Sequence, residues 1–319
     1  MISRHDALAL SADAFPQGPE ALSRHLKVRV ETGVLSGCEG WCIRRGEHAI
    51  IRINAASAAT RQRFTLAHEL AHLILGTRPD VLREPFRSVT AEEKAADQLA
   101  SELLIPDERA RAFLGRTLPI DAKRIERLAL MANVSSVMAA CRIVSMTTEL
   151  GLQNAAVAFF DGEGRYKWRY SAGLKFTDDE AARLYPMVIA SPTPLRIPNA
   201  DGNTIVCSRI NAQQYAALLF QLLPPDIAEQ PTVEERTQQL RGLLFNGDYS
   251  FQQSVAGAIG WIRNKFSHLT VDAALAEFDA KYLQTKWTPA QRQRLMSSDG
   301  REFLRLELEK SCRIAGPEG

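Results

Sequence analysis

The segment RFTLAHELAHLILG, residues 63–76, places two histidines one helical turn apart. Polar residues precede it, Gly76 ends it, and no proline interrupts it, so we expect one continuous helix. Apolar or small side chains recur along it at spacings of three and four, at Phe64, Ala67, Leu70, Ala71 and Leu75. A helix with so wide an apolar surface faces protein rather than water, so this segment predicts a core helix.

The motif HELAH, residues 68–72, adds chemistry to that helix. His68 and His72 point the same way because they are four residues apart, and Glu69 lies about 100° further round. Zinc in hydrolases accepts two such imidazoles, and the glutamate can reach a water molecule beside the metal as general base. Alternatively, these polar residues simply face solvent, although their apolar neighbours and the cost of burying an unpaired carboxylate argue against that.

A catalytic zinc site typically has a third protein ligand, and the segment TAEEKAADQLASELLIP, residues 90–106, offers one. We expect a second helix here, with Thr90 as N-cap and Pro106 just beyond its end. Ala96, Ala100 and Leu103 align with Glu93 at spacings of three and four. Small side chains on that line allow this helix to pack closely against the first one.

Glu92 and Glu93 are equally acidic, so the choice between them depends on Asp97. Asp97 stands one turn after Glu93 and can accept a hydrogen bond from the outer N–H of a ligating histidine. We therefore expect Glu93 as the third ligand. The alternative is a capping box, Thr90-x-x-Glu93, in which the glutamate folds back onto the start of its own helix.

Together, RFTLAHELAHLILG and EKAADQLASELLIP resemble the ImmA/IrrE family of metallopeptidases, with similarity over about residues 45 to 148. HExxH followed by ExxxD is also similar to the wider gluzincin group. The resemblance implies a zincin-like fold, Zn²⁺ or else Mn²⁺ as cofactor, Glu69 as catalytic base, and as metal ligands His68, His72 and Glu93. Asp97 and Leu99 stand where many members have Asn and Phe, but neither difference touches an implied ligand.

The resemblance further implies a protein substrate, typically a helix-turn-helix transcriptional repressor encoded nearby. Its cleavage would switch on stress, DNA-damage or phage-defence genes, with single-stranded DNA as a candidate activator. Two other functions stay open at this point. The chain can be a DNA-binding regulator, or an antitoxin-like binding partner whose zinc is structural and closed by four protein ligands.

Composition bounds these functions only loosely. The chain has 319 residues, 45% hydrophobic and 24% charged, which is ordinary for a globular protein of two domains. A net charge of +2 gives no strong electrostatic signal for duplex DNA. The five cysteines are scattered, the N-terminus has no signal-like apolar stretch, and no run has membrane-spanning length. We therefore expect a cytoplasmic protein with reduced thiols and no membrane partner.

The region before the HELAH helix predicts the rest of the peptidase domain. Residues 6–36 are helix-like, and GWCIRRGEHAIIRINA, residues 40–55, predicts a hairpin that turns near Arg45 to His48. An extended substrate can add to such a strand edge and be held there by main-chain hydrogen bonds. We therefore expect this small sheet to take part in substrate binding.

Residues 120–146 have the pattern of a helix-turn-helix, with a break at residues 133–135. The start of its second helix carries serine, valine, methionine and alanine, where a base-reading helix needs Arg, Asn, Gln or Lys. Packing against the catalytic core is the favoured interpretation, and major-groove recognition is the alternative.

A change of composition at residues 147–155 marks the expected domain boundary. We predict an α+β protein with a helix-rich metallopeptidase domain, residues 1–148, that contains a small sheet and the helix-turn-helix-like segment. A mixed α/β domain, residues 152–319, follows, and the resemblance suggests a regulatory, GAF-like sensor role for it. Thr177-x-x-Glu180 and Thr232-x-x-Glu235 predict capping boxes at two helix starts.

Two further groups of residues have candidate roles. Arg165, Lys167 and Arg169 alternate with aromatic residues that include Trp168, so one strand face can be cationic and the other aromatic, as in single-strand binders. An ordinary half-buried strand has the same pattern. Cys42 and Cys207 are candidates for an inhibitory thiol on the zinc, although cysteines are commonly just small buried residues.

Overall fold

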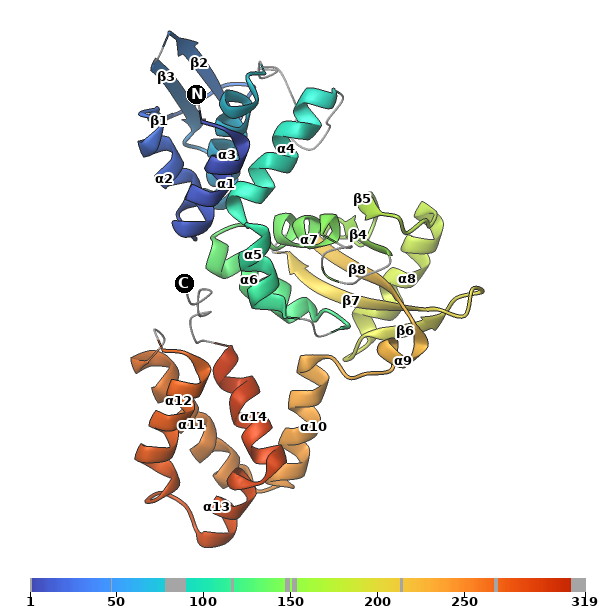
Figure 1. Cartoon of the computed structure of the whole chain (residues 1–319). Helices are drawn as coiled ribbons and strands as arrows, with labels where there is room; N and C mark the ends of the chain where they lie inside the picture. The colour runs from blue at the N-terminus through green and yellow to red at the C-terminus, as the bar shows by residue number, and fades with distance from the viewer. Residues whose placement is uncertain are drawn as a thin grey trace. The chain divides into compact units, whose positions relative to one another are not determined.

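The computed structural model describes residues 2–46, 48–77, 90–115, 118–146, 150, 154–212, 215–266 and 269–310. Its helices are α1 (Arg4–Asp13), α2 (Gly18–His25), α3 (Ala59–Leu75), α4 (Ala91–Leu104), α5 (Asp107–Leu114), α6 (Ala122–Ala132), α7 (Ser136–Ser145), α8 (Asp178–Ala190), α9 (Pro225–Ala228), α10 (Val233–Phe245), α11 (Tyr249–Lys265), α12 (Val271–Phe278), the π-helix η1 (Asp279–Leu283), α13 (Pro289–Met296) and α14 (Ser298–Glu309). Its strands are β1 (Arg29–Gly33), β2 (Gly40–Arg45), β3 (His48–Asn54), β4 (Asn154–Phe160), β5 (Tyr166–Ala172), β6 (Leu195–Pro198), β7 (Thr204–Ala212) and β8 (Tyr215–Leu223). Helices and two separate sheets along one chain confirm the predicted α+β class (Figure 1).

The chain forms two compact units. The first comprises Met1–Arg116 and Ala122–Pro225, and the second comprises Thr117–Asp121 and Asp226–Gly319. The second unit thus begins inside the region that the sequence suggested as one C-terminal domain. Residues 147–149 and 151–153, around the expected boundary, lie outside the described residues, so that boundary stays a prediction.

The three-stranded sheet of the first unit has the order β1-β3-β2. The predicted hairpin is confirmed, because β2 and β3 pair antiparallel around a turn at Gly46. The prediction of helix for residues 6–36 is correct for α1 and α2 but wrong for residues 29–33, which form β1 parallel to β3. Val30 and Thr32 are β-branched and favour a strand, and β3 offers them its open edge.

The predicted helices at residues 59–75 and 91–104 are both confirmed as α3 and α4. α3 ends at Gly76, whose φ of 69° is the left-handed conformation that glycine adopts readily. Four fully buried alanines lie on the two helices, which contact one another: Ala67, Ala71, Ala96 and Ala100. Their small side chains allow the two backbones to approach closely.

α3 also packs against β2 and β3, and the contact with β2 requires a glycine. A Cβ atom on Gly40 would lie 2.4 Å from Cγ2 of Thr65 and 2.9 Å from the main-chain oxygen of Arg52. β2 can therefore lie tightly against the helix of the HELAH motif only because position 40 has no side chain.

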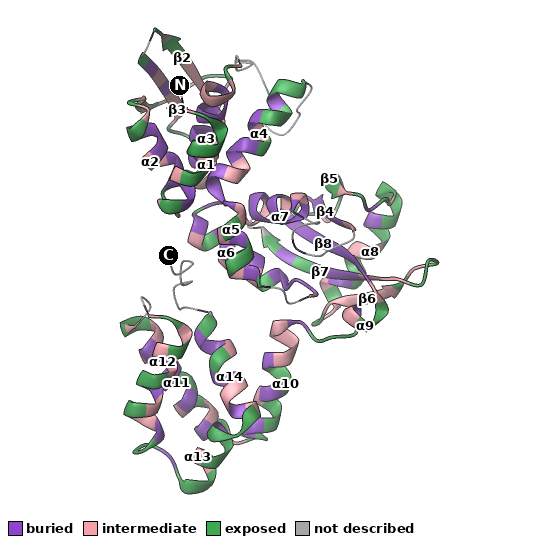
Figure 2. Cartoon of the chain, viewed as in Figure 1, coloured by how far each residue is buried: buried purple, intermediate pink, exposed green. Residues whose placement is uncertain are grey.

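The helix-turn-helix-like segment is present, with α6 and α7 at 112° and Asn133 at a φ of 51° between them. Residues Met138, Ala139 and Ala140 near the start of α7 are buried, and α7 contacts α4 and the strands β4, β5 and β7 (Figure 2). The expected packing against the catalytic core is thus only part of its role, because the five-stranded sheet is its other partner. Most of this helix is thus covered, while Ser135, Ser136 and Val137 at its start stay at least partly exposed and carry none of the side chains that usually read bases.

Arg142 of α7 anchors this helix to the end of α4. Its side chain is buried, its Nε donates to the main-chain oxygen of Ile105 at 3.1 Å, and its guanidinium pairs with Asp107. A charged hydrogen bond to the otherwise free carbonyl at a helix end stabilises that end.

The five-stranded sheet is antiparallel and has the order β5-β4-β8-β7-β6. Alternate residues of β4, including Ala156 and Phe160, share a hydrophobic core with Val188 of α8. The helix α8 starts with the predicted capping box of Thr177 and Glu180, which is confirmed.

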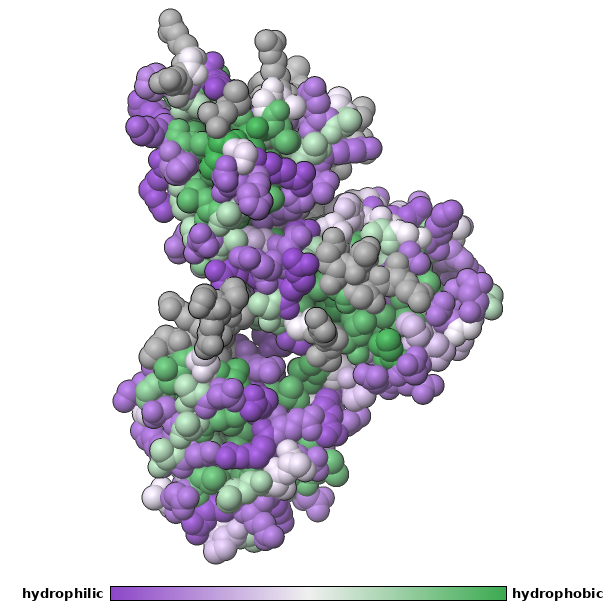
Figure 3. Space-filling view, viewed as in Figure 1, coloured by the Kyte–Doolittle hydropathy of each residue, from purple (hydrophilic) through white to green (hydrophobic). Residues whose placement is uncertain are grey.

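The second unit is helical and has its own core, which includes Phe251, Phe278 and Phe303. Hydrophilic side chains dominate the face of this unit that Figure 3 shows. The second predicted capping box, of Thr232 and Glu235, is confirmed at the start of α10. In the described part of the chain, no single helix is long and apolar enough to cross a membrane, while the bent pair α6 and α7 passes that test by length and composition only.

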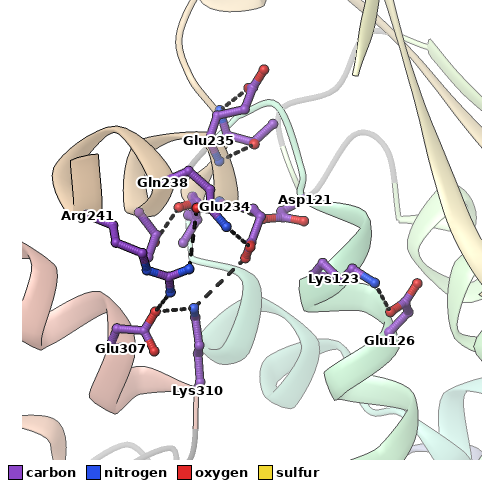
Figure 4. Close-up of polar contacts among 12 residues, drawn as sticks. Asp121, Lys123, Glu126, Glu234, Glu235, Gln238, Arg241, Glu307 and Lys310 are labelled. Atoms are coloured by element: carbon purple, nitrogen blue, oxygen red, sulfur yellow. Dashed lines mark hydrogen bonds and ion pairs between the residues drawn. The ribbon is translucent and has the colours of Figure 1, made fainter. Parts of the chain in front are cut away.

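A buried carboxylate joins three helices of the second unit. Glu307 of α14 accepts hydrogen bonds from Arg241 at 3.0 Å, from Arg263 at 2.7 Å and from Lys310 at 2.7 Å. Figure 4 shows Arg241 and Lys310 converging on it, and Lys310 also lies near Glu234. Burial alone raises the pKa of Glu307, but the hydrogen bond from Lys310 and the three positive charges outweigh it and lower the pKa.

Replacement of this carboxylate is expected to destabilise the second unit. We expect Glu307→Gln to lower the free energy of unfolding by about 2 kcal/mol, because three cations lose a charged acceptor. The fold lowers the pKa of Glu307. The stability that this carboxylate contributes is therefore complete above the pKa of Glu307 in the unfolded chain, and it is lost as the pH falls from there through the lower pKa of the folded state. Urea unfolding of the full chain at neutral and acidic pH checks both effects. The exposed Glu229 is the control, and an equal effect of Glu229→Gln would contradict this account.

Candidate metal centre

The structure brings His68, His72 and Glu93 together from two helices. The Nε2 atoms of the two imidazoles lie 3.1 Å apart. The two carboxylate oxygens of Glu93 lie 3.4 Å from the Nε2 atoms of His68 and His72, one against each ring. His72 and Glu93 are almost completely buried, with exposed fractions of 1% and 3%.

The spacing of these atoms fits a tetrahedral divalent ion. Ligands about 2.0–2.1 Å from a tetrahedral ion lie about 3.4 Å from one another. In the structure the three side chains offer ligand atoms that are all within 4.8 Å of one another, and the closest pairs are 3.1 and 3.4 Å apart. Two imidazoles and one carboxylate are also a donor set that zinc accepts. The residues present therefore fit the expected metal.

The alternative role of Glu93 as half of a capping box is only partly realised. The hydroxyl of Thr90 accepts a hydrogen bond from the main-chain N–H of Glu93 at 3.2 Å, so Thr90 is the N-cap. The carboxylate of Glu93, however, is directed at the two histidines. The neighbouring Glu92 is exposed, so the structure separates the two acids that the sequence offered.

Each imidazole has a polar partner at its outer nitrogen. Nδ1 of His68 lies 2.9 Å from Oδ1 of Asp97, as the sequence suggested. Nδ1 of His72 lies 2.7 Å from Oγ1 of Thr77. Such partners fix the ring orientation and leave Nε2 as the atom that faces the metal position.

Thr77 is the residue of this site that the sequence reasoning missed. It lies beyond the end of α3, so the helical periodicity does not include it. The left-handed Gly76 turns the chain, the main-chain N–H of Thr77 bonds to the main-chain oxygen of His72 at 3.1 Å, and the side chain comes to rest beside the His72 ring. Gly76 directly before a hydroxyl residue was the only available signal.

The electrostatics of the site follow from its burial. Burial raises the pKa of Glu69 to about 7, the nearby His68 opposes the change, and Glu93 adds to it. Burial lowers the pKa of His68, but the hydrogen bond to Asp97 and the charges of Asp97, Glu69 and Glu93 reverse this and raise it. Among the described residues, Oε2 of Glu69 has no hydrogen-bond partner although it is buried. A buried acceptor without a partner is costly, and a water molecule at the metal position would satisfy it.

The two candidate inhibitory cysteines lie in different places. Burial, and secondarily the charge of Glu69, raise the pKa of the Cys42 thiol on β2 to about 12. Cys207 is fully buried in the core of the five-stranded sheet. In the part of the chain that the structure describes, neither belongs to the group of possible metal ligands, so the inhibitory thiol stays a prediction.

The candidate nucleic-acid strand differs from its expected form. A β-bulge at Phe159 and Phe160 places Tyr166 against Phe160 and Trp168 against Phe159, which point to opposite faces of the sheet. Tyr166 and Trp168 therefore do not share one face.

The cations of that strand are engaged by acids. Arg165 and Lys167 both pair with Asp161, at 2.9 and 3.0 Å, and Arg169 pairs with Asp178 at 2.6 Å. Cations already neutralised by nearby carboxylates offer little to phosphates.

Comparisons with known proteins find similar sequences for part of the chain. Residues 29–144 match the model of the IrrE N-terminal-like domain family. This segment belongs to the ImmA/IrrE family. Over 107 residues, the chain is 33% identical to the "Radiation response metalloprotease IrrE" of Deinococcus radiodurans, and the aligned part is 32% of each chain. The chain thus spans about a third of the length of this ImmA/IrrE relative.

A solved structure of a Mycobacterium tuberculosis transcriptional regulator is also similar, with 16% identity and a TM-score of 0.45. The similar part is 69% of this chain and 76% of that one. A likeness this weak carries no conclusion about fold or function.

The contacts of the imidazoles predict how metal affinity responds to mutation. We expect Asp97→Asn and Thr77→Val each to weaken Zn²⁺ binding by about 10- to 100-fold, because each removes the partner that orients one ring. Glu93→Gln is expected to weaken it more, since it replaces a charged ligand. Competition with a chromophoric chelator measures the dissociation constants. Glu92→Gln is the matched control, and a loss of affinity there equal to that of Glu93→Gln would contradict the assignment.

Proposed function

We propose that the chain is a zinc-dependent endopeptidase that cleaves a specific protein, most simply a helix-turn-helix repressor encoded nearby. The observation that supports this most directly is the buried group of His68, His72 and Glu93 with the unpaired carboxylate oxygen of Glu69 beside it. The membership of residues 29–144 in the ImmA/IrrE family supports the same activity. A cytoplasmic location, and a regulatory, GAF-like sensor role for residues 152–319, belong to the same proposal.

In this proposal the residues of the site have separate roles in peptide hydrolysis. A divalent ion held by His68, His72 and Glu93 would acidify water and polarise the scissile carbonyl. Glu69 accepts the proton of the attacking water and returns it to the leaving amine. Burial raises the pKa of Glu69, and a divalent ion beside it would oppose that shift and favour the ionised form that a base needs.

The edge of β2 is the proposed place for the substrate backbone. β2 is an edge strand of its sheet and packs against α3, while Ile43 on it is 58% exposed. An extended peptide added to that edge would lie beside the helix that carries His68 and Glu69. Gly40, which lets β2 approach α3, would set the distance between substrate and metal.

The alternative of a DNA-binding regulator has less support. Ser136 and Val137 at the start of α7 are partly exposed but are not base-reading side chains, and the three cations Arg165, Lys167 and Arg169 are paired with acids. The alternative of a structural zinc requires a fourth protein ligand. Within the described residues, the metal-binding group contains three.

The decisive test is cleavage of the repressor encoded beside this protein. We expect two fragments with the wild type, and a cleavage rate lower by about 100-fold or more with Glu69→Gln, because general acid–base catalysis is lost. Zn²⁺ binding should persist in that variant, since Glu69 is not a ligand. Reactions with and without single-stranded DNA show whether DNA activates the enzyme. Fragments that form equally fast with Glu69→Gln would rule out the assigned base.

Binding at a strand edge makes a separate prediction about the substrate. We expect proline substitutions near the cleavage site to reduce kcat/KM at alternate positions, because only every second N–H of an added strand bonds to β2. Alanine at the same positions is the control. A proline scan without any such periodicity would argue against the β2 edge.

A further inference from the structure

The second unit carries a row of aromatic rings bordered by lysines. Phe266, Trp261 and Tyr282 follow one another with ring centroids 5.5 and 5.9 Å apart. All three rings are partly exposed and rest on the hydrophobic core of this unit. Their inner faces are thus fixed, while part of each ring remains open to solvent.

Three exposed lysines cover these rings. The Nζ atom of Lys281 lies 3.1 Å from the centroid of Trp261, and that of Lys265 lies 5.0 Å from the same centroid. The Nζ atom of Lys286 lies 5.1 Å from the centroid of Tyr282. Among the described residues, none of these three lysines has a carboxylate within ion-pair distance.

Two of the nearby acids are already used. Asp279, two residues before Lys281, is bound by both guanidinium nitrogens of Arg301 at 2.6 and 2.5 Å. Asp272 pairs with Arg305 at 2.8 Å. Glu277, four residues before Lys281, is exposed and has no ion pair among the described residues. Three lysines against this one acid still leave a local positive charge that the net charge of the chain, +2, does not reveal.

The backbone at this surface is unusual as well. Lys281 and Tyr282 lie on η1, a π-helix that continues α12. Such single-turn widenings of a helix are rare and often occur at functional sites.

We propose that the lysine–aromatic row, Lys265, Lys281 and Lys286 with Trp261, Phe266 and Tyr282, binds single-stranded nucleic acid. Phosphates attract the lysines away from the rings, and the exposed ring faces then stack with unpaired bases. A duplex keeps its bases stacked inside and offers only the phosphates. An acidic protein segment likewise offers charge without flat faces. The combination of cations that lack a carboxylate partner with partly exposed rings thus favours a single strand.

The test is binding of a labelled oligothymidylate of about 16 nucleotides to the full chain, followed by fluorescence anisotropy at several salt concentrations. The lysine variant combines Lys265→Gln, Lys281→Gln and Lys286→Gln. The matched control combines Lys27→Gln, Lys94→Gln and Lys175→Gln, which removes three exposed lysines that have no ion pair among the described residues. Both variants have the same net charge.

We expect the lysine variant to bind about tenfold more weakly or worse, and its slope of log affinity against log salt to fall by about 2. The control should stay within about twofold of the wild type. Trp261→Leu keeps an apolar side chain on the core but removes the stacking face, so it should weaken binding about fivefold or more without changing the salt slope. Quenching of tryptophan fluorescence in the wild type reports the same stacking without any mutation.

Three results would overturn the proposal. One is an equal loss of affinity in the lysine variant and its control, which would mean that only total charge matters. Another is equal affinity for the single strand, for a duplex of the same length and for polyglutamate. The third is the absence of oligothymidylate binding by the wild type at low salt. None of these measurements depends on proteolysis, so they leave the proposed peptidase activity untouched.

Discussion

The close contact between α3 and α4 is the constraint on which the site depends. Ala67 and Ala71 on one helix and Ala96 and Ala100 on the other are fully buried, and such small side chains allow two helices in contact to approach closely. This proximity brings the carboxylate of Glu93 within 3.4 Å of both imidazoles. Burying three polar side chains together carries a desolvation cost, which a divalent ion bound by them would offset.

The second constraint is orientation, and it comes from outside the HELAH motif. Asp97 holds one ring from α4, and Thr77 holds the other from the turn after α3. Glu69 has the opposite arrangement, because its buried Oε2 has no partner among the described residues. This arrangement suits the proposed hydrolysis, in which His68, His72 and Glu93 would hold a metal and Glu69, as base, would find its partner in water and substrate.

The parts of this site that sequence could predict are those that follow helical geometry. α3 fixes His68, Glu69 and His72 relative to one another, and α4 fixes Glu93 and Asp97, so helical spacing predicted which of them lie together, while their roles stay predictions. Thr77 could not be predicted in the same way, because its position depends on the left-handed conformation of Gly76 and not on the periodicity of a helix. The helix prediction for residues 29–33 was wrong for a related reason. Whether so short a segment forms a strand depends on its pairing with β3 more than on its own sequence pattern.

The strand around residues 165–170 and the lysine–aromatic row show that sequence alone also fails to predict which cations are available to bind a ligand. Alternating cations and aromatic residues at positions 165–170 look like a binding face in the sequence, but one bulge divides the rings between two faces and Asp161 and Asp178 neutralise the cations. Lys265, Lys281 and Lys286 are scattered in the sequence, yet the fold gathers them over one row of rings. What decides whether a cation can bind a ligand is the carboxylate that the fold places beside it. Sequence spacing cannot give that information for residues on different elements.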